Sequence, residues 1–236
     1  MTEQKILIIT GADGGLGKSV TTALLAEGWI LYAAVFNEKS KEILTQLFPD
    51  QIDKTLFPMI ADLSKESEVR NFFASVKGSI FGLVHLAGGY KGGNSISNYT
   101  EADFDFLMDL NVKPTFLLMK EIVPILKKAG EGAIVTIGAK PVLHQSKGNA
   151  LYTASKSALV AITLSVAEEC RDFNVRANVI LPATLQTPNN LSWATEEQYK
   201  TFTPTEDVAD TIVFLMSDKA KGITGINIPM YNKIEW

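Results

Sequence analysis

Residues 10–17 have the sequence Thr-Gly-Ala-Asp-Gly-Gly-Leu-Gly, and this glycine-rich segment decides how the rest of the chain is interpreted. It follows an unbroken apolar run at residues 6–10 and precedes a helical pattern of apolar residues at 16–27. Glycines at such a strand-to-helix turn let the backbone approach a pyrophosphate, which the amides and dipole of the helix N-terminus stabilise. The segment therefore predicts a phosphate-binding turn near the start of an α/β fold.

Two other interpretations of the glycine-rich segment stay open. In one of them it is a tight turn that binds no ligand. In the other it is a P-loop, because Gly17, Lys18 and Ser19 match the end of the pattern G-x-x-x-x-G-K-S. That pattern requires a glycine five residues before Gly17, where this chain has Ala12. A nucleotide hydrolase is therefore the weaker alternative.

Strand-like and helix-like segments alternate along the whole sequence. The strand-like runs are unbroken rather than alternating, which is typical of parallel strands buried on both faces. The expected fold over residues 1–236 is therefore a single α/β domain with one doubly wound, Rossmann-type parallel sheet and helices on both faces. Pro58 is expected to make its strand irregular, and Pro114 and Pro124 to bend one long helix. Besides the first strand and helix, the predicted strands are 29–36, 56–61, 81–86, 133–137, 175–181 and 225–230, and the predicted helices are 39–48, 66–76, 101–128, 152–171 and 207–216.

Composition excludes several classes of function. The net charge is −4, and acidic and basic residues are mixed along the chain, so no basic footprint for nucleic acid is expected. No apolar run approaches the roughly 18 to 20 residues that span a bilayer, and no signal peptide is recognisable. One cysteine, Cys170, favours a reducing, cytoplasmic setting. His85 and His144 lie far apart without ligand-spaced partners, so no metal site is expected.

Tyr152 and Lys156 form the pattern Y-x-x-x-K within a predicted helix. Residues i and i+4 share one helix face, so the phenol and the ammonium are expected to project together. A nearby cation favours the phenolate and lowers the pKa of a tyrosine, which then exchanges protons near neutral pH. The alternative is an ordinary Tyr/Lys pair on a solvated helix face.

The glycine turn near the start of the chain and the Y-x-x-x-K pair further along occur in the same order as in the short-chain dehydrogenase/reductase family. The chain resembles this family over nearly its whole length. Asn111 lies where the family has its structural and catalytic asparagine, and Tyr152 and Lys156 where it has its proton donor and its ribose-binding lysine. His85 and Leu86 depart from the family by replacing the two asparagines of N-N-A-G. The resemblance implies a bound NAD or NADP held by Gly11, Asp13, Gly15, Leu16, Gly17, Asp62, Leu63, Ala87, Gly88, Gly89, Tyr152, Lys156 and Thr187.

A second departure concerns the family's substrate-orienting serine, thirteen residues before the tyrosine, where this chain has Ala139. Losing one such polarising donor costs about 2.7–4 kcal/mol of transition-state stabilisation. A conjugated, electron-poor acceptor would lose less than an ordinary ketone, because its own electronics assist hydride addition. His144 and Ser146 are the candidates for a replacement donor.

Three loops resemble one subgroup of the family, the quinonoid dihydropteridine reductases. They are Gly-Ala-Lys at 138–140, residues 87–94, and residues 181–188. The resemblance implies an NAD(P)H-dependent reductase of a small conjugated acceptor, with a quinonoid dihydropterin as one candidate. Trp193 or Tyr90 would then stack on a flat ring or serve only in packing. The alternatives are a carbonyl reductase of an acyl or sugar substrate and a non-catalytic dinucleotide-binding protein.

Cofactor choice and assembly are less strongly specified by the sequence. NAD-preferring relatives carry an acidic residue at the end of the second strand, whereas this chain has Val35 near that position. Asn37, Lys39 and Ser40 would accept a 2′-phosphate, so NADP is slightly favoured over NAD. The family resemblance also implies a homodimer or homotetramer formed through two long helices.

Overall fold

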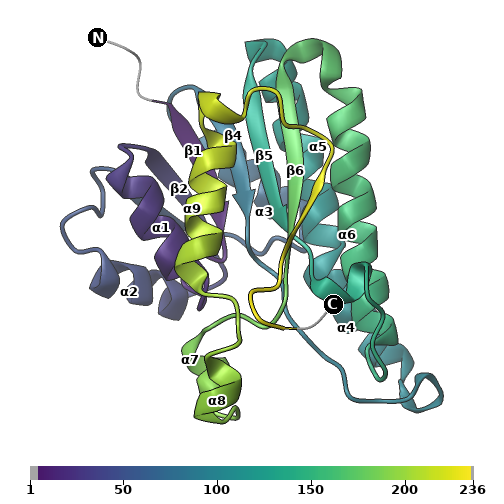
Figure 1. The fold of residues 1–236 in the computed structure, drawn as a ribbon. Coiled ribbons are helices and arrows are strands. Elements are labelled where there is room, and N and C mark those ends of the chain that lie inside the picture. The colour runs from purple at the N-terminus through teal and green to yellow at the C-terminus, as the bar shows by residue number, and fades with distance from the viewer. Residues whose placement is uncertain (1–4, 235–236) are drawn as a thin grey trace.

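The chain folds around one seven-stranded sheet that is covered by helices on both faces (Figure 1). The computed structural model describes residues 5–234. The strand order is β3-β2-β1-β4-β5-β6-β7, and every neighbouring pair is parallel. The doubly wound α/β fold is thus confirmed, whereas the single domain over 1–236 stays a prediction. The strands are β1 (Ile6–Thr10), β2 (Ile30–Val35), β3 (Leu56–Ile60), β4 (Ile80–His85), β5 (Gly132–Ile137), β6 (Val175–Pro182) and β7 (Asn227–Met230).

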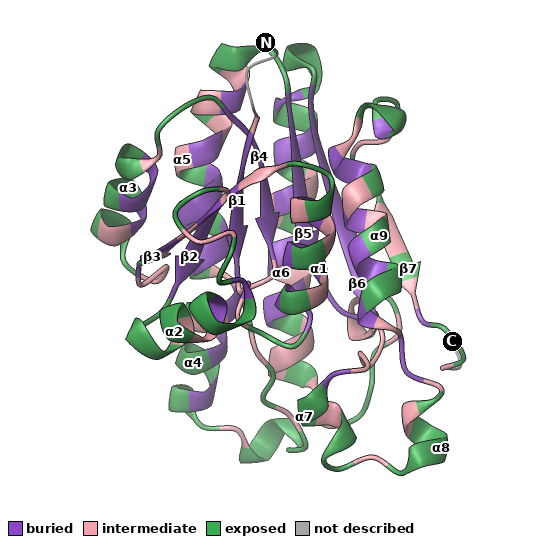
Figure 2. Cartoon of the chain, turned by 90° about the vertical axis from the view of Figure 1, so that its left-hand side faces the viewer, coloured by how far each residue is buried: buried purple, intermediate pink, exposed green. Residues whose placement is uncertain are grey.

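Successive side chains of the central strands pack alternately into two separate hydrophobic cores, one on each face of the sheet. In β1, Leu7 and Ile9 pack against one layer of helices, and Ile6 and Ile8 pack against the other. All of β1 is buried, as the purple strands of Figure 2 show, which explains its unbroken apolar sequence. The first layer holds α1 (Gly17–Ala26), α2 (Glu38–Leu47) and α9 (Thr205–Met216), and the second holds α3 (Glu66–Ser75), α5 (Lys113–Ala129) and α6 (Ala150–Glu169).

The chain reverses its direction of winding between β1 and β4, which are neighbours in the sheet. In open α/β sheets the loops after two such strands diverge to opposite faces and leave a crevice that binds ligands. Three further helices lie around this end of the sheet, at the bottom of Figure 1. They are α4 (Glu101–Asn111), α7 (Pro188–Leu191) and α8 (Glu196–Tyr199).

The predicted helix at 101–128 is two helices, so this expectation was wrong. Helix α4 ends at Asn111 and α5 begins at Lys113, with Val112 between them. Pro114 lies in the first turn of α5, where a missing backbone N–H costs nothing. Pro124 lies inside α5 without ending it. The break brings Asn111 to the end of a helix, beside the crevice.

Pro58 does not disrupt its strand. It lies inside β3 and pairs in register with Ala33 of β2. Strand β3 is at the edge of the sheet, so the backbone groups on one of its sides form no hydrogen bonds with a neighbouring strand. A proline, which has no backbone N–H, is tolerated at such a position. The expected irregularity was therefore wrong.

Helix α6 is long and apolar enough on average to cross a membrane, although its apolar residues do not form an unbroken run. Its 20 residues, Ala150–Glu169, meet that test by length and composition, alone among the helices of residues 5–234. The helix packs against β6 and α4, however, and buries Ser155 and Lys156. These contacts are typical of a core helix that is apolar on more than one side.

Candidate active site

The glycine-rich turn lies between two other loops and has no room for side chains. Gly11 has a φ of +68°, and a Cβ there would lie 2.8 Å from the backbone nitrogen of Ala87. A Cβ on Gly15 would lie 2.7 Å from Cγ2 of Thr187. The turn therefore touches the loops after β4 and β6, and glycine is required at both contacts.

A cavity of about 620 Å³ lies over this turn, and we call it the glycine-turn cavity. It extends from the N-terminus of α1 across the ends of β2, β3 and β4. All the expected cofactor residues of the glycine turn and of the loop after β3 line it, as do Ala87 and Gly88. The lining residues are Gly11, Asp13, Gly14, Gly15, Leu16, Gly17, Ala34, Phe36, Ala61, Asp62, Leu63, Ser64, Leu86, Ala87, Gly88, Phe106, Asp109, Leu110 and Pro114.

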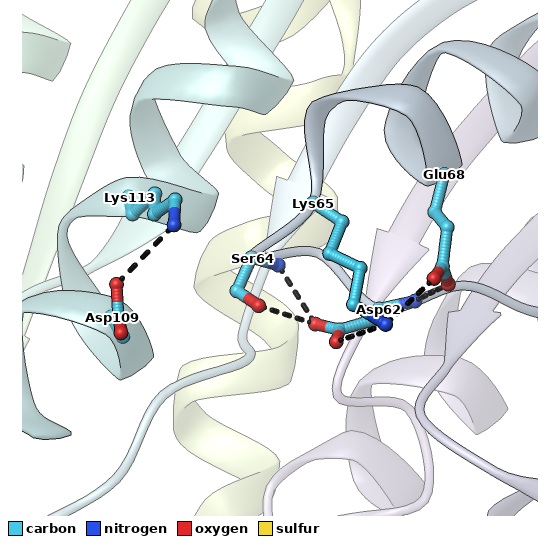
Figure 3. A network of polar contacts seen from close by, with 6 residues as sticks. All are labelled: Asp62, Ser64, Lys65, Glu68, Asp109 and Lys113. Atoms are coloured by element: carbon cyan, nitrogen blue, oxygen red, sulfur yellow. Dashed lines mark hydrogen bonds and ion pairs between the residues drawn. The ribbon is translucent and has the colours of Figure 1, made fainter.

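Asp62 is held in place beside this cavity by the first residues after β3 (Figure 3). Its Oδ1 accepts hydrogen bonds from the backbone and the hydroxyl of Ser64, at 3.0 and 2.7 Å. Lys65 Nζ lies 3.2 Å from Oδ2. The hydroxyl bond from Ser64 and the charge of Lys65 lower the pKa of Asp62, so this carboxylate is ionised at neutral pH. It is a fixed acceptor at the end of β3.

A second cavity, of about 820 Å³, continues from the first, and we call it the tyrosine cavity. Leu86 and Gly88 line both cavities, so the two are contiguous. Its lining includes Gly89, Tyr152, Lys156 and Thr187, the remaining expected cofactor residues. The full lining is Leu86, Gly88, Gly89, Tyr90, Ile137, Gly138, Ala139, Lys140, Pro141, Ser146, Asn149, Tyr152, Lys156, Pro182, Ala183, Thr184, Leu185, Thr187, Asn189, Asn190, Trp193 and Ile234.

Tyr152 and Lys156 enter the tyrosine cavity from the first turns of α6. The Tyr152 ring meets the ring of Tyr90 edge to face, with centroids 4.9 Å apart. Burial and the neighbouring Tyr90 raise the pKa of Tyr152 to about 12. Lys156 is 5% exposed, and its Nζ donates to the carbonyl of Ile137 at 3.0 Å. Burial lowers the pKa of this ammonium to about 8.

These values correct the expectation that Lys156 lowers the pKa of Tyr152. The expectation considered only the attraction between an ammonium and a phenolate. Removing the phenolate from water is the larger effect here, because the ring is buried against another aromatic side chain. Tyr152 therefore keeps its proton throughout the neutral range.

Asn111, the last residue of α4, ties the loop after β4 to α6. Its Oδ1 accepts from the backbone N–H of Gly89 at 3.0 Å, and its Nδ2 donates to the Gly89 carbonyl at 3.1 Å. The same Nδ2 lies 3.1 Å from Oγ of Ser155. A Cβ on Gly88 would lie 2.7 Å from Asn111 Oδ1 and 3.0 Å from Lys156 Nζ. The asparagine and the lysine thus meet at this glycine.

His85 has a structural role that sequence reasoning missed. Its Nδ1 lies 2.7 Å from Oγ1 of Thr10, and its Nε2 lies 3.1 Å from Oγ1 of Thr115. Thr115 donates its own proton to the Asn111 carbonyl, so it accepts from Nε2–H and leaves Nδ1 to accept from Thr10. Thr10 in turn accepts from the Ala87 amide at 3.1 Å. One directed chain of hydrogen bonds therefore joins both cofactor loops to Asn111.

Burial, together with the charge of Lys156, lowers the pKa of His85 to about 3. The imidazole is therefore neutral at every pH at which the chain would work, as the hydrogen-bond directions require. The signal in the sequence was His85 itself, a polar residue at the end of a buried apolar strand. It replaces an asparagine of the resembled pattern, and the two threonines complete its hydrogen bonds.

Comparison with known protein families supports a dinucleotide-binding oxidoreductase site of this kind. A family model described as short chain dehydrogenase matches residues 5–198, which include the glycine turn, Asn111 and the tyrosine–lysine pair. The chain belongs to the short-chain dehydrogenase family. Enzymes of this family are NAD(P)-dependent oxidoreductases, so the chain is an oxidoreductase that uses NAD or NADP and acts on a small molecule.

Relatives cover almost the whole length of the chain. 7alpha-Hydroxysteroid dehydrogenase of Bacteroides fragilis is 31% identical over 239 residues, 96% of this chain and 92% of the relative. 3-Oxoacyl-(acyl-carrier-protein) reductase FabG of Staphylococcus epidermidis is 28% identical over 238 residues, 95% and 96% of the two chains. The structure of ElxO with NADP bound superposes with a TM-score of 0.91 at 22% identity and covers 99% of each chain, which shows a shared fold.

Two of the residues considered for cofactor choice do not lie where the sequence suggested. Val35 is 1% exposed and packs in the core beneath α1 and α2, so it presents nothing to the glycine-turn cavity. The next residue, Phe36, is 67% exposed and lines the cavity instead. Asn37 caps α2 by accepting from the Ser40 backbone at 3.0 Å. The end of β2 therefore offers an aromatic ring in place of a polar ribose ligand.

The structure separates the two candidates for a replacement donor. Ala139 lines the tyrosine cavity beside the catalytic pair expected from the sequence, and its side chain has no hydroxyl. Ser146 lines the same cavity, whereas His144 does not and meets the ring of Tyr231 edge to face at 5.7 Å. Of the two candidates, only Ser146 is placed to reach a substrate in that cavity.

Proposed function

We propose that the chain reduces a small conjugated acceptor with a hydride from NADH or NADPH and a proton from Tyr152. The observation that carries this proposal is Ala139, which leaves the family's serine position in the tyrosine cavity without a donor. A bound dinucleotide supplies the hydride. The chain's own residues then have to bind the acceptor, exclude water and deliver one proton.

The two contiguous cavities fit an extended dinucleotide. The glycine-turn cavity offers the α1 N-terminus and the exposed backbone of Gly14 and Gly15 for a pyrophosphate. Asp62 offers a fixed carboxylate acceptor at the end of β3. We assign the nicotinamide end to the tyrosine cavity, beside Thr187 and Lys156.

We assign proton donation to the Tyr152 hydroxyl. A phenol with a pKa raised to about 12 keeps its proton at neutral pH and is therefore an acid in the direction of reduction. The Lys156 ammonium is the cation available on the same helix face, one turn away, to stabilise the phenolate that remains. Asn111 is a positioning residue, because it fixes the Gly89 loop against α6 through its three hydrogen bonds.

The missing hydroxyl at Ala139 decides which acceptors are reduced well. An ordinary ketone needs a donor at its oxygen, and losing one costs about 10²- to 10³-fold in rate. A conjugated acceptor spreads the added electron pair over several atoms and depends less on that donor. A quinonoid dihydropterin is one such compound, and the loops at 87–94, 138–140 and 181–188 support it by their resemblance to that subgroup. Neither curated relative named above is a pterin reductase, so this support is from the loop sequences alone.

A carbonyl reductase or alcohol dehydrogenase is the second candidate function. The two curated relatives are a hydroxysteroid dehydrogenase and a 3-oxoacyl reductase, which favours it. Ser146 also favours it, because Ser146 Oγ accepts from Asn149 Nδ2 at 2.7 Å and keeps its own proton to donate. Asn149 is polarised in turn by the Tyr90 hydroxyl, which donates to Oδ1 at 2.8 Å. A substrate carbonyl in the tyrosine cavity would be the acceptor.

A substrate panel distinguishes the two candidates. We expect a quinonoid dihydropterin or a quinone to be reduced with a kcat/KM at least about tenfold above that of acetoacetyl thioesters and simple ketones, measured as loss of nicotinamide absorbance. Ser146→Ala is expected to leave the conjugated acceptors unaffected. If the parent prefers a ketone and Ser146→Ala removes that preference, the carbonyl reductase is correct and Ser146 is its donor.

The pKa of Lys156 predicts how reduction depends on pH. Lys156 has a pKa of about 8 and loses its proton as the pH rises through that value, whereas Tyr152, with a pKa of about 12, keeps its proton over the same range. We therefore expect kcat/KM for the dinucleotide, which reports the free enzyme, to be level below pH 8 and to fall above it through one ionisation. A profile that stays level to pH 10 would contradict the role given to the ammonium.

Assembly and domain organisation are part of the proposal. Exposed apolar side chains lie on α4 and α5 outside the two cavities, namely Phe104 and Phe116, at 47% and 52% exposure. They support the proposed homodimer or homotetramer through these helices, since large exposed apolar patches mark interaction surfaces. We also propose that residues 1–236 act as one domain, because all the described strands join one sheet.

A further inference from the structure

We infer that Asp13 makes the chain select NADH over NADPH, by placing a carboxylate in the glycine-turn cavity where the adenosine ribose would lie. The inference rests on the proposed binding of a dinucleotide in that cavity. It reverses the slight preference for NADP that the sequence favoured, because the side chains behind that preference are not among the residues that line the cavity.

The charges that line the glycine-turn cavity are all of one sign. Its ionisable lining residues are Asp13, Asp62 and Asp109, and no lysine or arginine is among the residues that line it. Asn37, Lys39 and Ser40, the polar residues expected to accept a 2′-phosphate, do not line it either. A 2′-phosphate would therefore enter an acidic cavity without a cationic ligand.

Asp13 differs from the other two carboxylates in having no partner within the described residues. Asp62 has Lys65 at 3.2 Å, and Asp109 has Lys113 at 3.5 Å, as Figure 3 shows. For Asp13 neither an ion pair nor a side-chain hydrogen bond is found anywhere in residues 5–234. Its charge is thus uncompensated, and its oxygens remain available to a ligand.

The location of Asp13 also suits a ribose. In dinucleotide-binding folds the ribose hydroxyls are bound between the glycine turn and the end of the second strand, usually by an acid on that strand. Here the strand position is occupied by buried Val35, and Phe36 follows it. Asp13 approaches the same space from the turn, since Asp13, Ala34 and Phe36 line one cavity. It supplies from the glycine turn the carboxylate that β2 lacks.

The physical consequence follows from charge. A carboxylate accepts hydrogen bonds from the two ribose hydroxyls of NADH, and bonds to an ionised acceptor are the stronger kind. A 2′-phosphate replaces one of these donors with a dianionic group, which the carboxylate repels at short range. We expect NADH to bind about 10- to 100-fold more tightly than NADPH, a ratio that one such charge contact can produce.

The test measures the dissociation constants of NADH and NADPH by nicotinamide fluorescence, so it does not depend on turnover. The parent is compared with Asp13→Asn and Asp13→Ser, which remove the charge, and with Glu38→Gln. Glu38 is an exposed carboxylate in the first turn of α2 and does not line the cavity, so it controls for net charge. Thermal melting shows whether each variant is folded. The binding comparison then uses the Asp13 variant that melts like the parent.

We expect the ratio of the NADPH to the NADH dissociation constant to fall at least about tenfold in the Asp13 variants and to stay within about twofold in Glu38→Gln. A parent that binds NADPH as tightly as NADH overturns the inference, and so does an unchanged ratio in a folded Asp13 variant. Failure of the parent to bind either dinucleotide contradicts the proposed function as well, so the two failures are distinguishable.

Discussion

Replacing Tyr152 with phenylalanine is expected to lower kcat about 10²- to 10⁴-fold, the contribution typical of a positioned general acid. The substitution removes the hydroxyl and keeps the ring, so the edge-to-face contact with Tyr90 at 4.9 Å is retained. Lys156 also keeps its hydrogen bond to Ile137, since that bond does not involve the phenol. The dissociation constants of the dinucleotides should therefore stay within a few-fold of the parent's. Steady-state kinetics and a binding titration on one preparation measure both quantities.

Tyr199→Phe is a matched control for this loss. Tyr199 ends the short helix α8 and does not line either cavity, so removing its hydroxyl should leave kcat unchanged. Should Tyr152→Phe turn over like the parent, the phenol is not the acid. Ser146 would then be the first replacement to test, because its hydroxyl lines the same cavity and has a proton to donate.

The sequence predicted which residues gather around the two cavities, because the ends of parallel strands bring distant residues together at one edge of the sheet. The turn after β1, Asp62 after β3 and Gly88 after β4 are far apart in the chain, yet they line one cavity. Knowing that these segments follow parallel strands was enough to bring them together. The i, i+4 spacing of Tyr152 and Lys156 likewise fixed their common helix face, without any knowledge of tertiary structure.

Other features depended on packing that no local pattern reveals. The break at Val112 places Asn111 at a helix end, and its hydrogen bonds to Gly89 join segments more than twenty residues apart. The sequence placed the ribose-binding position at Val35, one residue before the residue that lines the cavity. Successive residues of a strand point to opposite faces of the sheet, so a shift of one residue reverses the side on which a side chain lies. Phe36, and not Val35, therefore reaches the cavity.

The pKa values were the least predictable property of the site. Whether a cation lowers the pKa of a phenol depends on how much water both groups have lost, and sequence spacing contains no information on burial. Here desolvation is the largest cause of the pKa shift of Tyr152, Lys156 and His85 alike, although Tyr152 is half-buried and the other two are fully buried. The site keeps a protonated phenol, a weakened ammonium and a neutral imidazole within one buried region.

Restoring a hydroxyl with Ala139→Ser is expected to raise kcat/KM for simple ketones about 10²- to 10³-fold, the effect of one polarising donor at a developing oxyanion. Ala139 has an extended backbone, with φ −161° and ψ 154°, which serine adopts without strain, and its side chain lines the tyrosine cavity. The added oxygen is small enough to remain in a cavity of about 820 Å³ without filling it.

The same variant should change the reduction of a conjugated acceptor by less than about tenfold, since that acceptor already stabilises the added electron pair. The informative quantity is the ratio of kcat/KM for a ketone to kcat/KM for a conjugated acceptor, compared between the parent and Ala139→Ser. Differences in the fraction of active enzyme cancel in this ratio. The neighbouring Gly138 is not a suitable site for adding a hydroxyl, because a Cβ there would lie 2.4 Å from Cδ2 of Leu181. An equal gain for both acceptor types would mean that the hydroxyl assists hydride transfer in general, and Ala139 would then no longer argue for a conjugated substrate. No gain for ketones would mean that the parent already has a donor, with Ser146 the residue to remove next.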